Sequence, residues 1–435
     1  MAATKLSGSD PSPQPGDHIL IIGAGITGLT LAQALRKRNS ENPSAAPINF
    51  SIYERDEHAL ARGAGWALSL HWALGQFTAL LPQDLVQRLP EALVDPDSAA
   101  RGELGNFRLF NLQTGKDDFM TPPSDSPRNR FSREKLRRLL MKGLDIHWSK
   151  NLETIDYPKQ GEVVAQFSDG TSATGTILVG CDGSRSQVRR VLCPANYKNN
   201  VVPIRLLGVT APYSPERCKP IQALDRYFFQ CCDPATDTFM FYGFLNVPTL
   251  KEQNATTETL PITCQVLTSW PYRPGFMGKD EVTEVPVENN ERLMLMKNFS
   301  SGWAEPFKQL VHDIPDTAEV KVINLEDWPP QKSAWNNREG RVTLIGDAAH
   351  AMTMYRGEAA NHGIADVRVF LEQFLPGEGE ALQSKIDAYE IEMIERTRPA
   401  VLRSRKACIH AHDYASLTDQ SPLIARRAIV VDDED

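Results

Sequence analysis

The chain has 435 residues, of which 41% are hydrophobic and 23% are charged, as in ordinary soluble globular proteins. Its net charge of −8 excludes the strongly basic character of a typical nucleic-acid-binding protein, so we expect no nucleic-acid partner. The seven cysteines are irregularly spaced and form no Cys-x-x-Cys pair, which predicts free thiols in a reducing, cytoplasmic compartment and no metal site.

Residues 1–16 are polar and lack the basic start and apolar core of a signal peptide, so they predict a disordered lead-in. The longest apolar stretch, residues 19–35, is interrupted by glycines and threonines. It also falls short of the ~20 residues that a membrane-spanning helix needs. We therefore expect no stable membrane span.

A strand–helix–strand unit follows the lead-in. Residues 19–22 are continuously apolar, as in a parallel strand buried on both faces. Residues 26–38 have helical periodicity, and residues 48–53 predict a second strand after a polar insertion. The buried side of the helix is expected to carry Leu29, Ala32 and Leu35. This order predicts a βαβ unit.

The turn of this unit reads Gly23-Ala-Gly25-Ile-Thr-Gly28. Gly23 allows a tight turn, Gly25 lets a pyrophosphate approach the backbone, and Gly28 allows the helix to pack closely on the strand. Glu54, at the end of the second strand, can accept hydrogen bonds from an adenosine ribose. The motif predicts dinucleotide binding without separating FAD from NAD, and a tight turn with no ligand is the alternative.

The next part of the chain is less regular. Residues 82–127 contain several prolines and glycines. Residues 132–141 predict a short basic helix that Ser132 caps, with an apolar side formed by leucines. Residues 163–167 and 172–179 predict a hairpin that continues into a strand. The Asp182-Gly183 pair that follows, taken alone, predicts a simple capped turn without a ligand.

A third strand–turn motif lies near the C-terminus. The strand predicted over residues 341–345 ends in Gly346-Asp347-Ala-Ala-His350. This places the Asp347 carboxylate where ligands of open α/β sheets bind, and it would accept hydrogen bonds from ribityl hydroxyls. A turn aspartate without a ligand is the alternative, and we expect His350 to be structural. A helix is predicted from near Gly357 through Asn361, with its N-terminus facing the same crevice.

Between residues 192 and 328, β-branched and aromatic residues alternate with turns, which predicts an inserted antiparallel sheet. Within it, Arg226 and Tyr242 are candidate catalytic residues, because arginine favours a phenolate and tyrosine can shuttle a proton. A packed sheet face is the alternative. The aromatic run from Phe239 to Phe244 is expected to be core. Residues 382–414 are predicted to be helical, with a kink or break at Pro399.

The order and spacing of these motifs resemble the FAD-dependent aromatic hydroxylases. These are single-component flavoprotein monooxygenases with a para-hydroxybenzoate-hydroxylase-like fold, here of the type found in fungal secondary metabolism. The resemblance runs from Ile19 to about Tyr414 and includes Arg133 in the run Ser-Arg-Glu-Lys-Leu. It implies an α/β fold: a Rossmann-like, GR2-type FAD-binding domain with a mixed sheet, an inserted antiparallel-sheet substrate domain and C-terminal helices.

The chain is accordingly expected to divide into five parts. These are a lead-in at 1–16, an FAD-binding domain at 17–80, 128–190 and 338–375, a substrate-binding domain at 81–127 and 191–337, C-terminal helices at 376–420, and an acidic tail at 421–435, of which residues 430–435 are expected to be frayed.

The resemblance implies a role for each motif. The three turn glycines would hold the FAD pyrophosphate, and Glu54 the adenosine ribose. Arg133 would contact the pyrophosphate or the ribityl region, and Asp347 the ribityl chain. Asp182 and Gly183 would touch FAD and also the nicotinamide donor.

Two loops are implied to lie beside the flavin ring. The first is the segment from Gly357 to Asn361, which includes Ala360. The second is the loop at residues 62–66 with Gly65, for which an ordinary glycine loop is the alternative. The chain departs from the family pattern at Ala351, Met354 and Ala359, which puts the geometry of the loop where oxygen meets the flavin in question.

The expected activity is that of an NAD(P)H-consuming FAD monooxygenase. It would insert one atom of O2 into an electron-rich phenolic, polyketide-like or alkaloid-like small molecule through a flavin C4a-hydroperoxide. No second dinucleotide fingerprint is expected, because NAD(P)H binds such enzymes transiently. The protein is expected to be a monomer or a dimer.

Three alternatives stay open. The first is another flavin-dependent oxidoreductase, such as a Baeyer–Villiger enzyme, an epoxidase or a dehydrogenase. The second is a halogenase, against which Trp303-Ala-Glu-Pro306 counts, because it lacks the halogenase pattern Trp-x-Trp-x-Ile-Pro. The third is a non-catalytic FAD-binding protein.

Overall fold

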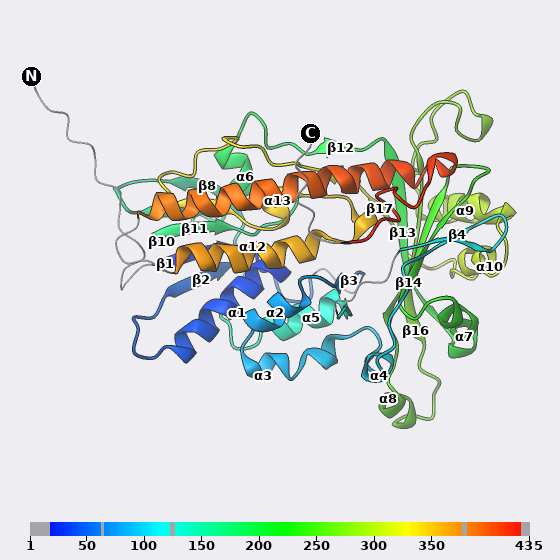
Figure 1. The fold of residues 1–435 in the computed structure, drawn as a ribbon, viewed down its shortest axis with the longest axis horizontal. Helices are drawn as coiled ribbons and strands as arrows, with labels where there is room; N and C mark the ends of the chain where they lie inside the picture. Colours follow the sequence, from blue (N-terminus) through cyan, green and yellow to red (C-terminus); the bar gives the residue numbers. More distant parts are fainter. Residues whose placement is uncertain (1–17, 62–64, 122–126, 376–380, 428–435) are drawn as a thin grey trace, which may run out of the picture.

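The computed structural model describes residues 18–61, 65–121, 127–375 and 381–427. The predicted lead-in, part of the loop at 62–66 and the end of the acidic tail lie outside these residues. The chain forms two lobes, each built around a sheet, and a long helix runs along both of them (Figure 1).

The first lobe contains a five-stranded sheet in the order β19-β11-β1-β2-β7. Every pair of neighbours in it is parallel, which is consistent with the continuous apolar runs of its strands. The antiparallel strands of this lobe form separate sheets, so the central sheet is parallel rather than mixed. The five strands are β1 His18–Ile22, β2 Asn49–Tyr53, β7 Ile146–His147, β11 Ile177–Gly180 and β19 Val342–Leu344.

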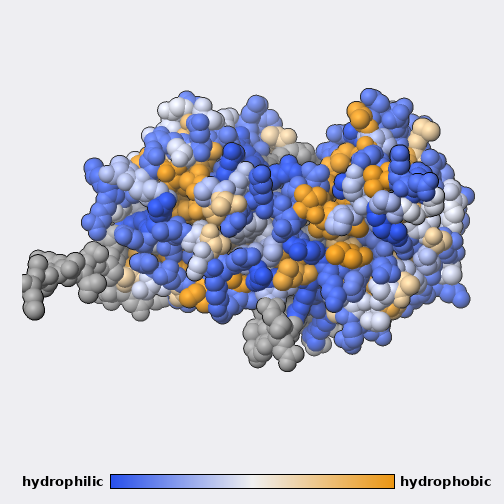
Figure 2. Space-filling model, turned by 90° about the horizontal axis from the view of Figure 1, so that it is seen from above, coloured by the Kyte–Doolittle hydropathy of each residue, from blue (hydrophilic) through white to orange (hydrophobic). Residues whose placement is uncertain are grey.

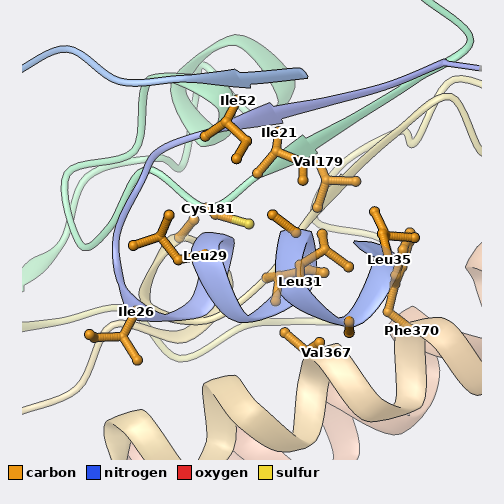
Figure 3. Close-up of a cluster of buried hydrophobic side chains, with 14 of the residues drawn as sticks. Ile21, Ile26, Leu29, Leu31, Leu35, Ile52, Val179, Cys181, Val367 and Phe370 are labelled. Carbon is orange, nitrogen blue, oxygen red and sulfur yellow. The ribbon is translucent and has the colours of Figure 1, made fainter. Parts of the chain in front are cut away.

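Helix α1, Ile26–Glu41, lies between this sheet and helix α12, Ala359–Phe374 (Figure 3). It is three residues longer than predicted. The predicted apolar side is confirmed, since Leu29, Ala32 and Leu35 are fully buried. The same core contains Ile21, Ile52 and Val179 from the strands and Val367 and Phe370 from α12.

Smaller elements complete the first lobe. The predicted hairpin is confirmed as β9 Val163–Phe167 and β10 Ser172–Gly175. The strand predicted over residues 172–179 is interrupted at Thr176. Its second part, β11, belongs to the parallel sheet and not to the hairpin. The other elements are β8 Leu152–Asp156, the pair β3 Ala67–Leu70 and β6 Asn129–Ser132, and the helices α2 Leu74–Leu80, α3 Gln83–Val86, η1 Leu89–Ala92, α5 Arg133–Leu140 and α6 Gln187–Leu192. Helix α4, Pro96–Ala100, follows η1 in the chain, and its Asp97 accepts a hydrogen bond from the Leu250 N–H at the start of α8, Leu250–Asn254, in the second lobe.

The second lobe contains a seven-stranded sheet in the order β17-β13-β16-β15-β14-β4-β5. Its pairs are antiparallel except for β4 with β14, so the predicted antiparallel insertion is confirmed with one parallel pair. The strands are β4 Arg108–Asn111, β5 Asp117–Met120, β13 Ile204–Tyr213, β14 Phe228–Cys232, β15 Phe239–Asn246, β16 Ile262–Pro271 and β17 Val320–Ile323. A separate two-stranded ladder pairs β12 Asn200–Val201 with β18 Glu326–Asp327.

Helices pack against one face of this sheet. Apolar residues of α7, α9 and α10 share a core with alternate residues of strands β13 to β16, and the opposite face is left for the site described below. The helical elements here are α7 Pro215–Leu224, α8 Leu250–Asn254, η2 Phe276–Gly278, α9 Asn289–Phe299, η3 Ser300–Gly302 and α10 Phe307–His312.

Helix α13, Leu382–His410, connects the two lobes. Its first half packs in the core of the first lobe, and its end, at Ala407 and Cys408, packs against residues of the second sheet. Pro399 lies inside this helix and does not end it, so of the two predicted effects, a kink or a break, the break does not occur. Packing at both ends supplies free energy to offset the backbone hydrogen bond that proline removes. The remaining elements are α11 Asp347–His350, η4 Met354–Arg356 and η5 Tyr414–Ser416.

Three local expectations need correction. Ser132 occupies the N-cap position of α5, but its side chain makes no capping hydrogen bond. Leu81 and Leu85 pack in the core of the first lobe, so the domain boundary proposed at residue 81 moves toward residue 94. The boundary of the acidic tail proposed at residue 421 also moves, since Leu423 and Ile424 are buried against the second sheet, and the residues expected to be frayed, 430–435, lie outside the described part of the chain.

The surface carries mixed polarity, with small apolar patches separated by hydrophilic side chains (Figure 2). Among the described residues, no helix is both long enough and apolar enough to cross a membrane, and no cluster of metal-ligating side chains occurs. All seven cysteines are buried and free, as predicted.

Candidate active site

A cavity of about 610 Å³ is lined by residues from both lobes. At one end lie the glycine turn and the strand ends of the parallel sheet, and at the other lies the open face of the second sheet. The cavity lining includes nine of the residues predicted to bind FAD: Gly23, Gly25, Glu54, Arg133, Asp182, Gly183, Asp347, Gly357 and Ala360.

The glycine turn is built as its sequence predicts. Gly23 has φ +109°, and a Cβ there would lie 2.5 Å from the Cys181 carbonyl oxygen. A Cβ on Gly28 would lie 2.1 Å from the Gly23 oxygen, so Gly28 permits the close helix packing although it lies outside the cavity lining. A Cβ on Gly25 would meet nothing within 4 Å, because Gly25 faces the cavity.

The start of α1 therefore opens onto the cavity. Its N-cap is Gly25, which offers no side-chain cap, and its first turn contains no acidic residue. The unpaired N–H groups and the positive end of the helix dipole suit an anionic group such as a pyrophosphate. This cradle fits the diphosphate of FAD.

Glu54 borders the cavity and also braces the turn. Its carboxylate accepts hydrogen bonds from the backbone N–H groups of Ala24 at 2.7 Å and of Asp56 at 3.1 Å. Arg137 Nη2 lies 3.8 Å from it. A carboxylate has acceptor positions for more partners than these, so contact with a ribose stays compatible with the bracing role.

Helix α5 presents two arginines to the cavity, Arg133 and Arg137. Arg137 donates from Nε to the Ala24 carbonyl oxygen and from Nη1 to the Ala59 oxygen, both at 2.8 Å. Arg137 was not predicted as a site residue. Its position four residues after Arg133, which places both on one helix face, was the available signal.

The Asp182-Gly183 turn caps the start of helix α6, which is the simpler of the two roles predicted for it. The Asp182 carboxylate accepts hydrogen bonds from the backbone N–H groups of Gln187 at 2.6 Å and Val188 at 3.2 Å, at the start of α6. Burial raises its pKa. The turn still borders the cavity, so contact of Asp182 and Gly183 with FAD stays a prediction.

Asp347 presents its carboxylate to the cavity from the start of α11. It is exposed to the cavity, and within the described residues no donor hydrogen-bonds its carboxylate. Burial raises its pKa, and the charges of His350, Arg133 and Arg189 act in the opposite direction. An unsatisfied acceptor in this position fits a ligand that carries several hydroxyl groups, such as the ribityl chain of FAD.

We expect Asp347→Asn to weaken FAD binding by about tenfold or more, since hydrogen bonds to a charged acceptor contribute about 1.5–3 kcal/mol. The measurement is a titration of apoprotein with FAD followed by flavin fluorescence. Asp316→Asn, at a side chain that is 91% exposed, is the matched control. Equal FAD affinity for both variants would contradict the assignment.

The same substitution has a pH signature in the apoprotein. The pKa of the Asp347 carboxyl is higher in the folded than in the unfolded chain. Such a carboxyl lowers the free energy of unfolding once the pH rises above its pKa in the unfolded chain, and the full reduction is reached above its pKa in the folded chain. Apo Asp347→Asn should therefore be more stable than the parent at neutral pH, and this difference should vanish in acid.

A buried ionic network lies behind the Gly-Asp turn. Asp366 is fully buried and accepts hydrogen bonds from the Gly346 N–H at 2.7 Å, from His350 Nε2 at 2.6 Å and from Arg396 Nη2 at 2.7 Å. It thereby holds the turn that carries Asp347. His350 is part of this network and does not line the cavity, in agreement with its expected structural role.

The start of α12 also faces the cavity. Gly357 has φ +66°, and together with Ala359 and Ala360 it lines the wall. Asn361 does not line the cavity. Its Nδ2 donates to the Ser69 carbonyl oxygen at 2.9 Å and its Oδ1 accepts from the His71 N–H at 3.0 Å, so it ties α12 to the end of β3. The helix has no side-chain cap, and its positive end is directed toward the cavity.

The loop before β3 reaches the second sheet. The Gly65 carbonyl oxygen accepts a hydrogen bond from Gln265 Nε2 at 3.1 Å, and Gly65 itself does not line the cavity. The neighbouring Trp66, which belongs to the same predicted loop, does line it. Of the three departures from the family pattern, Met354 and Ala359 line the cavity and Ala351 packs behind it.

The second sheet supplies an aromatic and amide wall. Phe239 is buried in a hydrophobic core, as expected, and Phe241 packs against the same core, but both also line the cavity. Their neighbours in the strand, Tyr242 and Phe244, are core as expected. Other residues of this wall are Phe107, Phe228, Gln230, Gln265 and Leu267.

Neither candidate catalytic residue lies at the cavity. Tyr242 is on the opposite face of β15, where its ring stacks on Phe229 with centroids 5.2 Å apart. Arg226 precedes β14, has a side chain that is 38% exposed, and pairs through Nε with Glu103 at 2.7 Å. Both side chains point away from the space that a substrate would occupy, so this prediction is corrected.

Known proteins are similar to this chain in sequence. Residues 301–404 match the family described as "FAD binding domain". A protein of Arthroderma benhamiae named "Probable FAD-dependent monooxygenase" is 48% identical over 432 residues, which cover 96% of this chain and 97% of that protein. The chain belongs to the FAD-dependent monooxygenases. A further relative, FAD-dependent monooxygenase tazP of Aspergillus terreus, is 39% identical over 82% of this chain and 89% of its own length.

Solved structures share the fold of this monooxygenase. The 2,6-dihydroxypyridine-3-hydroxylase from Arthrobacter nicotinovorans matches with a TM-score of 0.70 at 20% identity, covering 98% of this chain and all of that one. HpxO from Klebsiella pneumoniae, complexed with FAD and uric acid, matches with a TM-score of 0.68 at 18% identity over 92% and 90% of the two chains. The predicted aromatic-hydroxylase fold and FAD as cofactor are therefore confirmed.

Proposed function

We propose that this monooxygenase oxidises NAD(P)H and inserts one atom of O2 into an electron-rich aromatic small molecule. In the balanced reaction, NAD(P)H, a proton, O2 and an aromatic C–H give NAD(P)+, water and an aromatic C–OH. The observation that supports it is one continuous cavity that runs from the glycine turn and Asp347 to an aromatic wall. Such a cavity accommodates a dinucleotide at one end and a flat apolar substrate at the other.

The residues would divide the work by position. Gly25 and the start of α1 would hold the diphosphate, and Asp347 the ribityl hydroxyls. Glu54 would hold the adenosine ribose, and Arg133 a phosphate or the ribityl region. FAD, when bound, supplies the transfer of reducing equivalents to O2.

The chain's own groups would shape the reacting end. The positive end of α12, at Gly357 to Ala360, would stabilise negative charge that develops beside it. Phe239, Phe241 and Leu267 would exclude water from the substrate, which strengthens electrostatic interactions at the site.

Several further expectations belong to the same proposal. We infer that the donor NAD(P)H binds transiently, that the enzyme acts in the cytoplasm as a monomer or dimer, and that its substrate is a phenolic, polyketide-like or alkaloid-like intermediate of secondary metabolism. These rest on the resemblance of its motifs and on relatives named as FAD-dependent monooxygenases.

The test is to follow NADPH and NADH oxidation and oxygen uptake by the FAD-loaded enzyme, with and without a broad panel of phenols. We expect at least one phenol to stimulate both rates, and its product to gain one oxygen atom from isotopically labelled O2. Absence of stimulation across the panel would count against hydroxylation of phenols. Stimulation without incorporation of labelled oxygen would instead favour a dehydrogenase or oxidase.

A further inference from the structure

Arg130 is a buried cation at the aromatic end of the cavity. It lies on β6, which with its partner β3 contacts β15 of the second sheet. Its side chain is 7% exposed and lines the cavity. Its guanidinium carbon lies 4.7 Å from the centroid of the Phe228 ring and 5.8 Å from that of Phe241. The cation is thus placed beside the rings that form the substrate wall.

The hydrogen bonds of Arg130 leave most of its donors free. Nη1 donates to Ser69 Oγ at 3.3 Å and Nε to the Phe244 carbonyl oxygen at 3.5 Å, both long for such bonds. Nη2 makes no hydrogen bond with any described residue. Because a guanidinium has five N–H donors, this arginine is only partly satisfied.

Arg130 also has no ion-pair partner among the described residues. The acidic group that acts on it electrostatically is Asp225. That carboxylate is occupied by the backbone N–H groups of Asn106 at 2.6 Å, Tyr227 at 2.9 Å and Phe228 at 3.2 Å. A second arginine, Arg128, stands over the Phe107 ring at 5.0 Å, so the neighbourhood carries an excess of positive charge.

The surrounding strand makes room for the guanidinium. A Cβ on Gly243 would lie 2.8 Å from Arg130 Nη2, so a larger residue at this position would displace the group. Burial lowers the pKa of Arg130 to about 10, which still leaves it charged at neutral pH. A buried cation without a counter-ion is costly unless an anion joins it.

We propose that Arg130 is the substrate-charge determinant of this monooxygenase: it selects a substrate whose ring bears an acidic hydroxyl and binds it as the phenolate. The inference rests on the proposed function and adds the ionisation state and the residue that sets it. The phenolate oxygen accepts from the guanidinium while the ring lies against Phe228 and Phe241, and neutral Gln230 and Gln265 line the same wall.

The experiment uses coloured phenols whose ionised and neutral forms absorb differently: 4-nitrophenol, 4-nitro-1-naphthol and alizarin. FAD-loaded enzyme is titrated with each probe across a pH series, and difference absorbance reports the bound form. An adjacent cation lowers the pKa of a phenol, so the bound probe should ionise about one pH unit or more below the free probe. Arg130→Met should abolish this difference and weaken binding of the phenolate at least about tenfold.

Three variants make the result specific to the guanidinium. Arg130→Lys should keep part of the lowered ionisation, because it keeps the charge. Gly243→Ala should also abolish the lowered pKa of the bound probe, because its methyl group displaces Nη2 of Arg130. This variant replaces Arg130→Met as the deciding test if Arg130→Met does not retain FAD. Arg226→Met is the control, since Arg226 lies just before β14, the strand that carries Phe228, pairs with Glu103 and lies outside the cavity.

The inference is overturned if the parent enzyme binds the probes as neutral phenols, if none of the three probes binds saturably, or if Arg130→Met and Gly243→Ala leave the ionisation of the bound probe unchanged. Failure of the proposed function is a separate outcome. In that case the probes bind as phenolates and respond to Arg130, but no phenol stimulates NAD(P)H oxidation.

Discussion

Replacing Gly25 with valine is expected to give a folded protein that purifies without FAD. Gly25 has φ −77° and ψ −179°, a conformation open to any residue, and a Cβ there meets no protein atom within 4 Å. The valine side chain would instead occupy the space where the diphosphate approaches the start of α1. We expect FAD affinity to fall by at least about 100-fold, which is about 2.8 kcal/mol.

Equilibrium titration of the apoprotein with FAD measures this loss, and thermal unfolding of the apo forms checks the fold. A β-branched residue at an N-cap costs about 1 kcal/mol, so the apoprotein should unfold only slightly earlier than the parent. Gly75→Val is the matched control, because Gly75 also has no atom within 4 Å of a built Cβ but lies on the exposed side of α2. Retention of tight FAD by Gly25→Val would show that the diphosphate does not bind at this turn.

Replacing Asp366 with asparagine is expected to be the most destabilising single change considered for the folded chain. The variant removes the fully buried one of the two counter-charges of Arg396, the other being the partly exposed Glu392, and it removes the charge of the acceptor shared by Gly346 and His350. Breaking a buried ion pair from one side costs roughly 3–5 kcal/mol. Urea unfolding followed by tryptophan fluorescence measures the cost. Glu372→Gln, which breaks an exposed pair with Arg368 on the same helix, should cost under about 1 kcal/mol.

The Asp366 effect should depend on pH in a defined direction. Burial opposes its ionisation, but the neighbouring His350 and Arg396 together hold its pKa below the usual value. A carboxyl with a lowered folded pKa contributes stability that is fully present above the unfolded pKa and is lost as pH falls through the folded pKa. The difference between the parent and Asp366→Asn should therefore shrink in acid. A difference that is constant with pH, or no larger than that of Glu372→Gln, would contradict the network.

The positions of the glycine turn and of Asp347 could be predicted from the sequence, because local chain geometry decides them. Gly23, Gly25 and Gly28 act through backbone conformation and close approach within a few residues of one another. Asp347 follows a buried parallel strand, and parallel strands end at the same edge of their sheet. Asn361 shows the limit of this reasoning. It is on the predicted segment, but its side chain turns back to hold β3.

The substrate wall was not open to prediction in this way. In a strand, successive side chains face opposite sides, so a shift of one residue exchanges the two faces. Phe241 and Tyr242 are neighbours in an equally apolar run. Helices α7, α9 and α10 pack on one face of the sheet, so Tyr242 on that face is in the core and Phe241 on the other face lines the cavity. Arg130 gives no local signal at all, because its role depends on Phe228 and Gly243, which lie about a hundred residues away in sequence.

The amino-acid sequence by itself determined the class of fold and the glycine turn at one end of the cavity, since these depend on short motifs with their own backbone requirements, and the order of all the motifs, through the family that they resemble, predicted FAD as the cofactor. The tertiary structure alone decided which side chains line the aromatic end of the cavity. Those side chains come from strands of two lobes whose exposed faces are set by long-range packing, and a buried charge such as that of Arg130 is recognised only once its lack of a partner can be seen.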